Sequence, residues 1–402
     1  MTLPSDFIAS LGPMHPREIF EIFVKKAWPK GGTHFELGNE LRPLDLFCYL
    51  GARFGSPNGF QNFLRADDSD NLIHWEWTLR HKAGLVSFQG MNFRTEIHIH
   101  GDVGATEADK AALVGQVKAD FATHGSEMSN ARKHLEHWVE FVNPYQRIKL
   151  SIDGLLEELA ALKLDPDRDA LDVFQWETAD LAVMKKRAEE RGARYSKGFG
   201  FCFGIRSMLP VLAEAYINLL IYLLMRPEIR GDDRLRDNVF RQPIDVRIKS
   251  LSINCVGFAK QPDYASDACR RYHTLVNERN DLLHGNVAID KLSFNEVHFW
   301  GKVPIFREYR TMWQRSLGVL VNAVGLRTVH ADVAVVTDLI SYIESCLDDE
   351  HKENAKLMSG RYELGLNKAT RRIGVLFPPW LTDFRAMRQR PGSAADESRA
   401  SE

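Results

Sequence analysis

The stretch that decides the fold of the C-terminal half is Glu214–Met225, which reads EAYINLLIYLLM. From Ala215 onward it is the most apolar run in the chain, about half the roughly 20 residues that a membrane-spanning helix needs. Apolar side chains fall on nearly every side of the corresponding helix, which is typical of a helix buried in a protein core. The sequence therefore predicts a buried helix over Met208–Met225 and no membrane span.

The sequence around this run predicts further helices. From about Ala170 onward, helical spacing of apolar residues predicts helices at 177–191, 234–256, 263–284, 306–326 and 332–349. The segment Lys197–Gly204, KGFGFCFG, carries glycines but has neither the GxxxxGK[ST] nor the GxGxxG spacing of a phosphate-binding loop. Its aromatic residues favour a packed connector between two helices.

The N-terminal part has the alternating pattern of β-strands. Ile73–Leu79 alternates apolar and polar residues, a turn at His81–Gly84 leads into Leu85–Phe88, and Phe93–His100 alternates again. These runs predict a small antiparallel sheet between about Asp45 and Gly101. Helical patterns follow at about 106–121, 129–142 and 145–162. The predicted fold class is α+β, with a mixed N-terminal module followed by an all-α helical bundle.

Turn-forming residues divide the chain. The Asp165–Pro166 pair is the best candidate for a domain boundary. We therefore expect an N-terminal α+β module over 1–165, a helical domain over 166–350, a C-terminal extension over 351–387 and a disordered tail over 388–402.

Composition limits the classes of function. The chain has 402 residues, enough for two or three domains, and its formal charge of −2 provides no overall basic field for nucleic acid. The N-terminus lacks the pattern of a secretory signal, so we expect a cytoplasmic protein. The cysteines are scattered, without a CxxC pair, which favours reduced thiols over disulfides or a zinc site: Cys48, Cys202, Cys255, Cys269 and Cys346.

Two histidine pairs have the spacing of possible metal ligands. On the predicted strand, His98 and His100 face one side and could share an ion, but Glu96 is the only carboxylate in line with them, and no cysteine or third histidine is near in sequence. His134 and His137 are neighbours on a predicted helix but lack the HExxH pattern. We interpret both pairs as ordinary polar surface, and we expect no metal and no cofactor.

The segment Asn277–Asn286, NERNDLLHGN, differs because its polar groups converge. At about 100° per residue, Asn280, Asp281 and His284 share one face of a helix, so an amide and a carboxylate can orient the imidazole. Arg279 lies further round and can grip a phosphate with two hydrogen bonds. A purely structural reading also exists, because Gly285 is a helix-ending glycine and a histidine in the last turn interacts favourably with the helix dipole.

This segment resembles a known motif. Arg279–Gly285, RNDLLHG, looks like the R-x4–6-H signature of HEPN domains, and Glu214–Leu220, EAYINLL, resembles their earlier core helix. The resemblance covers about 169–349 and implies a metal-independent ribonuclease, frequently a toxin or an anti-phage abortive-infection effector. It also implies that His284 transfers protons and that Arg279 clamps the phosphate. Asn280 would be the polar residue that orients these side chains. Asp281 and Glu214 would support these groups.

The resemblance also suggests partners. We expect RNA as substrate, a homodimer that combines two copies of the motif, and an antitoxin or phage-derived trigger acting on the N-terminal module. Local cations could hold the RNA, with a solvated helix face as the alternative reading: Arg241, Arg247, Lys249, Arg270 and Arg271. Two other functions stay open, namely a catalytically silent HEPN-like scaffold and a small-molecule enzyme sited in the N-terminal module.

Overall fold

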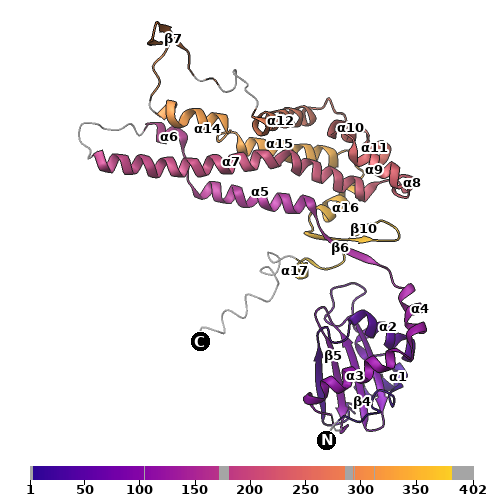
Figure 1. The fold of residues 1–402 in the computed structure, drawn as a ribbon. Helices are drawn as coiled ribbons and strands as arrows, with labels where there is room; N and C mark the ends of the chain where they lie inside the picture. The colour runs from indigo at the N-terminus through magenta and orange to yellow at the C-terminus, as the bar shows by residue number, and fades with distance from the viewer. Residues whose placement is uncertain are drawn as a thin grey trace. The chain divides into compact units, whose positions relative to one another are not determined.

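The computed structural model of the protein (Figure 1) describes residues 3–382 except 104, 172–180, 286–292, 294 and 312. It is 55% helical and 15% strand, which confirms the predicted α+β class. Contacts within the chain define two compact units. The first comprises residues up to Trp138 together with Leu376–Leu381, and the second comprises Val139–Val375.

The first unit is built on a five-stranded antiparallel sheet in the order β1-β3-β4-β5-β2. The predicted strands and the turn between the first two are confirmed as β3, β4 and β5. The elements of this unit are β1 (Gly12–Pro13), α1 (Pro16–Val24), β2 (Gly32–Leu37), α2 (Pro43–Phe54), η1 (Phe60–Phe63), β3 (Trp75–His81), β4 (Gly84–Gly90), β5 (Thr95–Gly101), η2 (Glu107–Asp109), α3 (Lys110–Phe121) and α4 (Gly125–Lys133).

The two faces of this sheet differ in chemistry because successive side chains point to opposite sides. One face carries the core of the unit, with Trp77, Phe88 and Ile97 buried against residues of α2 and α3. The other face carries polar side chains at the alternate positions. A small apolar cluster that includes Ile19 of α1 and Leu85 of β4 covers part of that second face. The same face also carries Thr78, Ser87, Glu96 and His98.

The second unit is organised around one long helix, α7 (Leu181–Leu224), which contains the apolar run. Its core packs side chains of α7 with those of α5, α12 and α15. The other elements of this unit are β6 (Trp138–Val142), α5 (Pro144–Ala161), α6 (Pro166–Leu171), α8 (Pro227–Arg230), α9 (Asp233–Arg241), α10 (Ile244–Lys249), α11 (Leu251–Asn254), α12 (Asp267–His284), β7 (Val297–Trp300), β8 (Val303–Phe306), η3 (Gln314–Gly318), α14 (Val319–Ala323), α15 (Val329–Glu344), α16 (Asp349–Ser359), β9 (Glu363–Asn367) and β10 (Ile373–Gly374). The last element of the chain, α17 (Pro379–Thr382), belongs up to Leu381 to the first unit.

The interpretation of Lys197–Gly204 as a connector is wrong, because these residues lie inside α7. Two glycines of the segment let α5 and the residues that follow it approach closely. A Cβ atom on Gly198 would lie 2.4 Å from Cδ1 of Leu164, and one on Gly204 would lie 3.3 Å from Cδ1 of Leu155. Gly198 and Gly204 therefore serve packing against α7, which a sequence pattern alone does not distinguish from a loop.

Other predicted helices also differ from the structure. The segment predicted as a helix over 129–142 ends at Lys133 as α4, and Trp138–Val142 is a strand that pairs with β9. The segment predicted over 234–256 is divided into α9, α10 and α11, and Pro243 precedes α10 because proline has no N–H to continue a helix. The segment predicted over 306–326 is helical only from about Trp313 onward.

The domain boundary predicted at residue 165 differs from the observed one, which follows Trp138. The physical reason is α5, whose Ile152 and Leu159 belong to the same buried core as the residues of α7. The C-terminal extension predicted over 351–387 is not separate either. Ala355 of α16 is part of this core, and β9 pairs with β6. The tail predicted over 388–402 lies outside the described residues.

Among the described helices, α7 is long and apolar enough, by length and composition, to cross a membrane. In the structure 56% of its most apolar window is buried inside the protein. Core helices of soluble proteins pass the same test, so this property is weak evidence for a membrane span.

Candidate active site

The predicted motif lies at the C-terminal end of α12, as the spacing indicated. His284 is the last residue of the helix and is exposed. Gly285 follows in the left-handed conformation, with φ 62° and ψ 32°, and its N–H bonds to the carbonyl oxygen of Asp281. A glycine adopts this conformation without the strain that a Cβ atom imposes. The helix therefore stops so that the imidazole of His284 is presented to solvent.

Arg279 and Asn280 are joined in the turn before this helix end. Nη1 of Arg279 donates a hydrogen bond of 3.0 Å to Oδ1 of Asn280. The Nε atom of Arg279 is buried, and within the described part of the chain it has no hydrogen-bond acceptor. Leaving such a donor unsatisfied costs about 1–3 kcal/mol. An oxyanion that reached this N–H would recover that cost.

An ionic cluster anchors α12 beside the motif. Nη2 of Arg206, on α7, donates a hydrogen bond of 2.7 Å to Glu278, and its Nε lies 2.9 Å from Asp332 of α15, though poorly aligned for a hydrogen bond. Burial raises the pKa of Asp332, and Glu278 adds to the rise while Arg206 opposes it. This cluster holds the helix that carries Arg279 against two neighbours.

Glu214, expected to support the catalytic residues, lies at a different level of the bundle. The hydroxyl of Tyr272 donates to the carbonyl of Pro210, and Glu278 accepts a hydrogen bond from Arg206. The later residue of α12 thus contacts the earlier residue of α7, so the two helices run antiparallel. Glu214 therefore lies level with the beginning of α12. A helix rises 1.5 Å per residue, which places His284 about 18 Å further along the axis than Tyr272. The structure does not bring Glu214 to the motif.

Four of the five expected RNA-binding cations are engaged within the protein, and the fifth, Arg241 at the end of α9, is exposed. Arg247, expected to bind RNA with a solvated helix face as the alternative, is only 7% exposed and donates to Glu214 at 3.0 Å and to Asn218 at 2.6 Å. It therefore does not lie on a solvated face. Arg271 lies 2.9 Å from Asp267 and 3.0 Å from Asp338, and Arg270 lies 3.7 Å from Asp267. Lys249 pairs with Asp245 at 3.1 Å.

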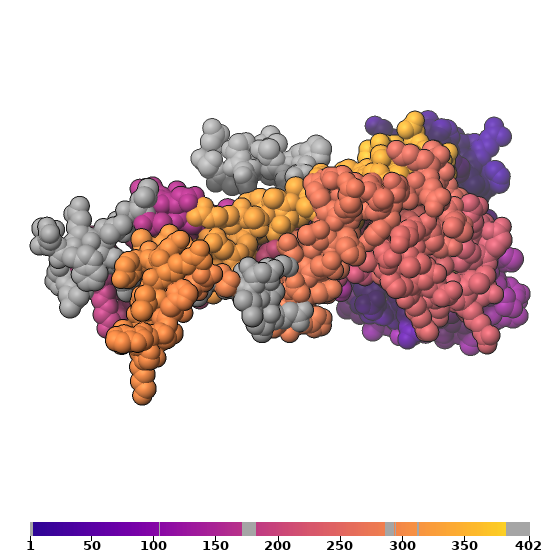
Figure 2. Space-filling model, turned by 90° about the horizontal axis from the view of Figure 1, so that it is seen from above, coloured from indigo at the N-terminus to yellow at the C-terminus, as the bar shows by residue number. Residues whose placement is uncertain are grey.

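Three of these cations nevertheless remain on the surface. The side chains of Lys249, Arg270 and Arg271 are 53%, 69% and 45% exposed. In Figure 2, the salmon-coloured segments between about residues 230 and 285, which carry them, form one continuous surface. Exposed ion pairs are worth little, at about 0–1 kcal/mol, and a phosphate can displace the carboxylate partner.

The two histidine pairs differ in their surroundings. His134 and His137 are exposed at the end of α4 and just after it. His98 and His100 share a face of β5 as predicted, but His100 packs against Trp28, with ring centroids 4.9 Å apart. Burial lowers the pKa of His100, and the neighbouring His98 lowers it further.

The structure adds a histidine that the sequence analysis missed. His34 lies on β2, directly opposite His98 of β5, and their rings stack with centroids 4.7 Å apart. Glu96 lies within reach of both rings. A sequence signal for this strand exists in Thr33–Leu37, THFEL, where polar His34 and Glu36 alternate with apolar residues. That signal identifies a strand but not its partner.

In comparisons with known proteins, no family model, no curated protein and no solved structure matches this chain.

Proposed function

We propose that the chain is a metal-independent endoribonuclease of the HEPN type that acts through the C-terminal end of α12. The observation that carries the proposal is the exposed His284 at the end of the helix that holds the half-buried Arg279. Along the helix axis the two residues are separated by about 7.5 Å, so their long side chains can contact one phosphodiester. The resemblance of Arg279–Gly285 to the HEPN signature adds to this geometry.

The chemistry requires only proton transfer and charge stabilisation. In RNA the 2′-hydroxyl is adjacent to the scissile phosphate, so a base removes its proton and the oxygen attacks phosphorus. The bond to the 5′-oxygen breaks, that oxygen takes up a proton, and a 2′,3′-cyclic phosphate remains. An imidazole suits either proton transfer near neutral pH. Arg279 would stabilise the charge that develops on the phosphate oxygens.

Asn280 and Asp281 have supporting roles in this proposal. The amide oxygen of Asn280 accepts from Arg279 and so restricts the orientation of the guanidinium. The carbonyl of Asp281 accepts the N–H of Gly285 and thereby defines where the helix ends. Both residues position the two reactive groups.

The experiment is RNA cleavage by the purified full chain in EDTA, with analysis of the product ends. Wild type should leave 2′,3′-cyclic phosphates. His284→Ala should lower the rate by about 10²–10⁴, the range of general acid–base catalysis, and Arg279→Ala by about 10²–10³. His273→Ala, an exposed histidine on the same helix, is the matched control and should retain wild-type activity.

Three results would contradict this function. They are wild-type rates from His284→Ala, a strict requirement for a divalent ion, or equal cleavage of DNA, which lacks the 2′-hydroxyl. An inactive wild type that still binds RNA or a protein partner would instead support the silent HEPN-like scaffold.

We propose further that two copies assemble, because one motif supplies a single histidine whereas 2′-hydroxyl attack uses a base and an acid. The hairpin of β7 and β8 supports an association surface. Its apolar side chains are exposed, with Phe299 at 66%, Trp300 at 79% and Ile305 at 52%. An isolated two-stranded hairpin is marginally stable in water, and exposed apolar patches mark contact sites. A partner that covers it stabilises both strands.

We propose that in the cell this ribonuclease acts as an abortive-infection or toxin effector. A trigger or antitoxin would then act on the first unit. Expression of wild type should arrest growth, whereas His284→Ala expressed to the same level should not. Equal arrest by both would separate toxicity from the proposed active site.

A further inference from the structure

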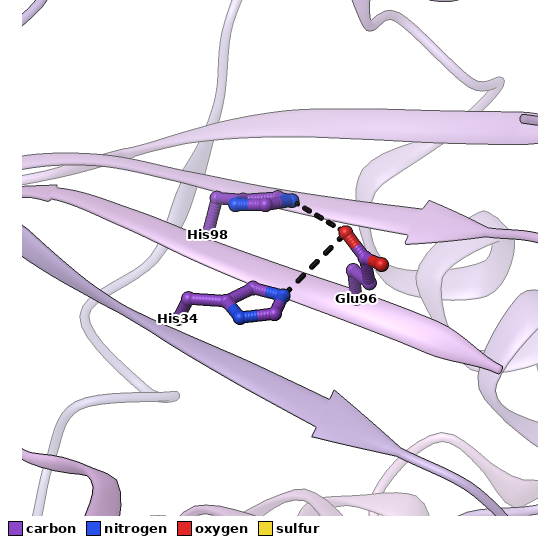
Figure 3. Close-up of side chains that lie close together, drawn as sticks. All are labelled: His34, Glu96 and His98. Atoms are coloured by element: carbon purple, nitrogen blue, oxygen red, sulfur yellow. Dashed lines mark hydrogen bonds and ion pairs between the residues drawn. The ribbon is translucent and has the colours of Figure 1, made fainter. Parts of the chain in front are cut away.

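Two histidines and a glutamate converge on the polar face of the N-terminal sheet (Figure 3). Glu96 and His98 are two positions apart on β5, so their side chains project to the same side. His34 reaches that side from β2, where it is the direct partner of His98 in the antiparallel ladder. Strand pairing thus brings His34 to Glu96 and His98, which are far from it in sequence.

The distances between the candidate ligand atoms suit a small ion. Oε2 of Glu96 lies 3.5 Å from Nε2 of His34 and 3.1 Å from Nε2 of His98, and one ligand atom from each residue lies within 4.8 Å of the others. Zinc bonds of about 2.0–2.1 Å in a tetrahedron place neighbouring ligand atoms roughly 3.3–3.4 Å apart. Small side-chain rotations are enough to reach that geometry.

The surroundings orient the carboxylate toward the histidines. Nε of Arg94 donates a hydrogen bond of 2.5 Å to Oε1 of Glu96, which leaves Oε2 directed at the two imidazoles. Partners of this kind hold metal ligands in place. The side chain of Glu96 is 11% exposed, whereas those of His34 and His98 are 46% and 31% exposed. An ion here is reachable from solvent.

We propose that His34, Glu96 and His98 form a Zn²⁺ site in the first unit. Two imidazoles and one carboxylate are the ligand set of zinc sites that keep a fourth position for water or a ligand group. The exposure of the two histidines leaves that position on the solvent side. The site is independent of the proposed ribonuclease residues, which belong to the second unit.

The test is metal binding to the full chain after treatment with EDTA and removal of the chelator. Zn²⁺ is titrated by calorimetry, and Co²⁺ is titrated by its visible absorption, which reports coordination by nitrogen and oxygen ligands. We expect one ion per chain. His34→Asn, Glu96→Gln and His98→Asn should each weaken binding by more than the roughly 10- to 100-fold that loss of an outer-shell partner costs. His137→Asn, an exposed histidine outside the cluster, is the control.

Two further readouts separate a metal site from a simple hydrogen-bonded cluster. Zn²⁺ should raise the temperature of unfolding of wild type but not of Glu96→Gln. Binding should weaken as the pH falls, because imidazole ligands must be unprotonated. The proposal is overturned if wild type binds no Zn²⁺ at about 100 μM, or if the three variants bind it as wild type does. Circular dichroism of each variant confirms that the sheet is intact.

Discussion

The guanidinium of Arg247 donates a hydrogen bond of 3.0 Å to the carboxylate of Glu214, and this contact joins α10 to α7. Removing one partner of a buried ion pair leaves the other charge without compensation. Glu214 is 39% exposed and stays partly hydrated, so we expect Arg247→Ala to lower the free energy of unfolding by about 1–3 kcal/mol, between the values for exposed and for buried pairs. Urea denaturation measures this loss.

The neighbouring Lys249→Ala is the matched control on the same helix. Its pair with Asp245 is exposed, so its loss should change the free energy of unfolding by less than about 1 kcal/mol. An Arg247→Ala protein of unchanged stability but weakened RNA binding would show that Arg247 contacts RNA after all.

Two glycines of α7 should respond oppositely to the same substitution. Gly200 is exposed and has open space around it, so Gly200→Ala should stabilise the protein by roughly 0.5–1 kcal/mol through helix propensity. Gly198 is buried, and a Cβ atom there would lie 2.4 Å from Leu164. Gly198→Ala should therefore show no gain or a loss. Thermal unfolding of both variants measures the difference, and equal stabilisation would contradict the close packing of Leu164 on α7.

Fragments should identify where the second unit begins. A fragment over 139–375 retains α5 and should fold with helical circular dichroism and a cooperative transition. A fragment that begins at Asp167 lacks Ile152 and Leu159, which are buried in the same core. It should expose apolar surface of α7 and aggregate. A soluble, cooperatively folded fragment from Asp167 would place the boundary near residue 165.

The first unit should lose stability in acid through Glu96. Burial alone would raise the pKa of Glu96, but the hydrogen bond and charge of Arg94, with His34 and His98, hold it below its ordinary value of 4.5. A lowered carboxyl pKa stabilises the folded state above the ordinary value, and this contribution disappears as the pH falls through the lower, folded-state pKa. Glu96→Gln should therefore be less stable than wild type at neutral pH, and the difference should shrink below about pH 4. Hydrogen exchange of the β5 peptide in EDTA measures the difference in stability between wild type and Glu96→Gln. If that difference is the same at every pH, the linkage to the pKa of Glu96 is contradicted.

The proposed dimer should make activity depend on concentration. Trp300→Ser removes the most exposed aromatic side chain of the hairpin strands, so it should weaken association in light scattering and lower activity per chain on dilution. Lys302→Ser, in the exposed turn of the same hairpin, is the control. Mixing wild type with excess His284→Ala should depress activity more steeply than dilution does. A monomer whose activity per chain is independent of concentration would exclude a composite site.

Local sequence determined much of the architecture. The period-2 runs over 73–79, 85–88 and 93–100 predicted β3, β4 and β5, because alternation reflects one buried face of a strand. The end of α12 was also predictable, since Gly285 can adopt a positive φ at no cost and the preceding turn carries Arg279, Asn280 and His284. Each of these features depends on residues within a few positions of each other.

Contacts between distant segments were decided only by the tertiary structure. Strand pairing brings His34 to His98 and Glu96. The spacing of residues along the chain does not predict that β2 pairs with β5. Packing of α5 and the residues after it along α7 makes Gly198 and Gly204 close contacts and moves the unit boundary to Trp138. Folding buries Arg247 against Glu214, although arginine side chains are mostly exposed in proteins. The physical reason is that local patterns report which face of an element is buried, whereas the partner that buries it is chosen by the packing of the whole unit.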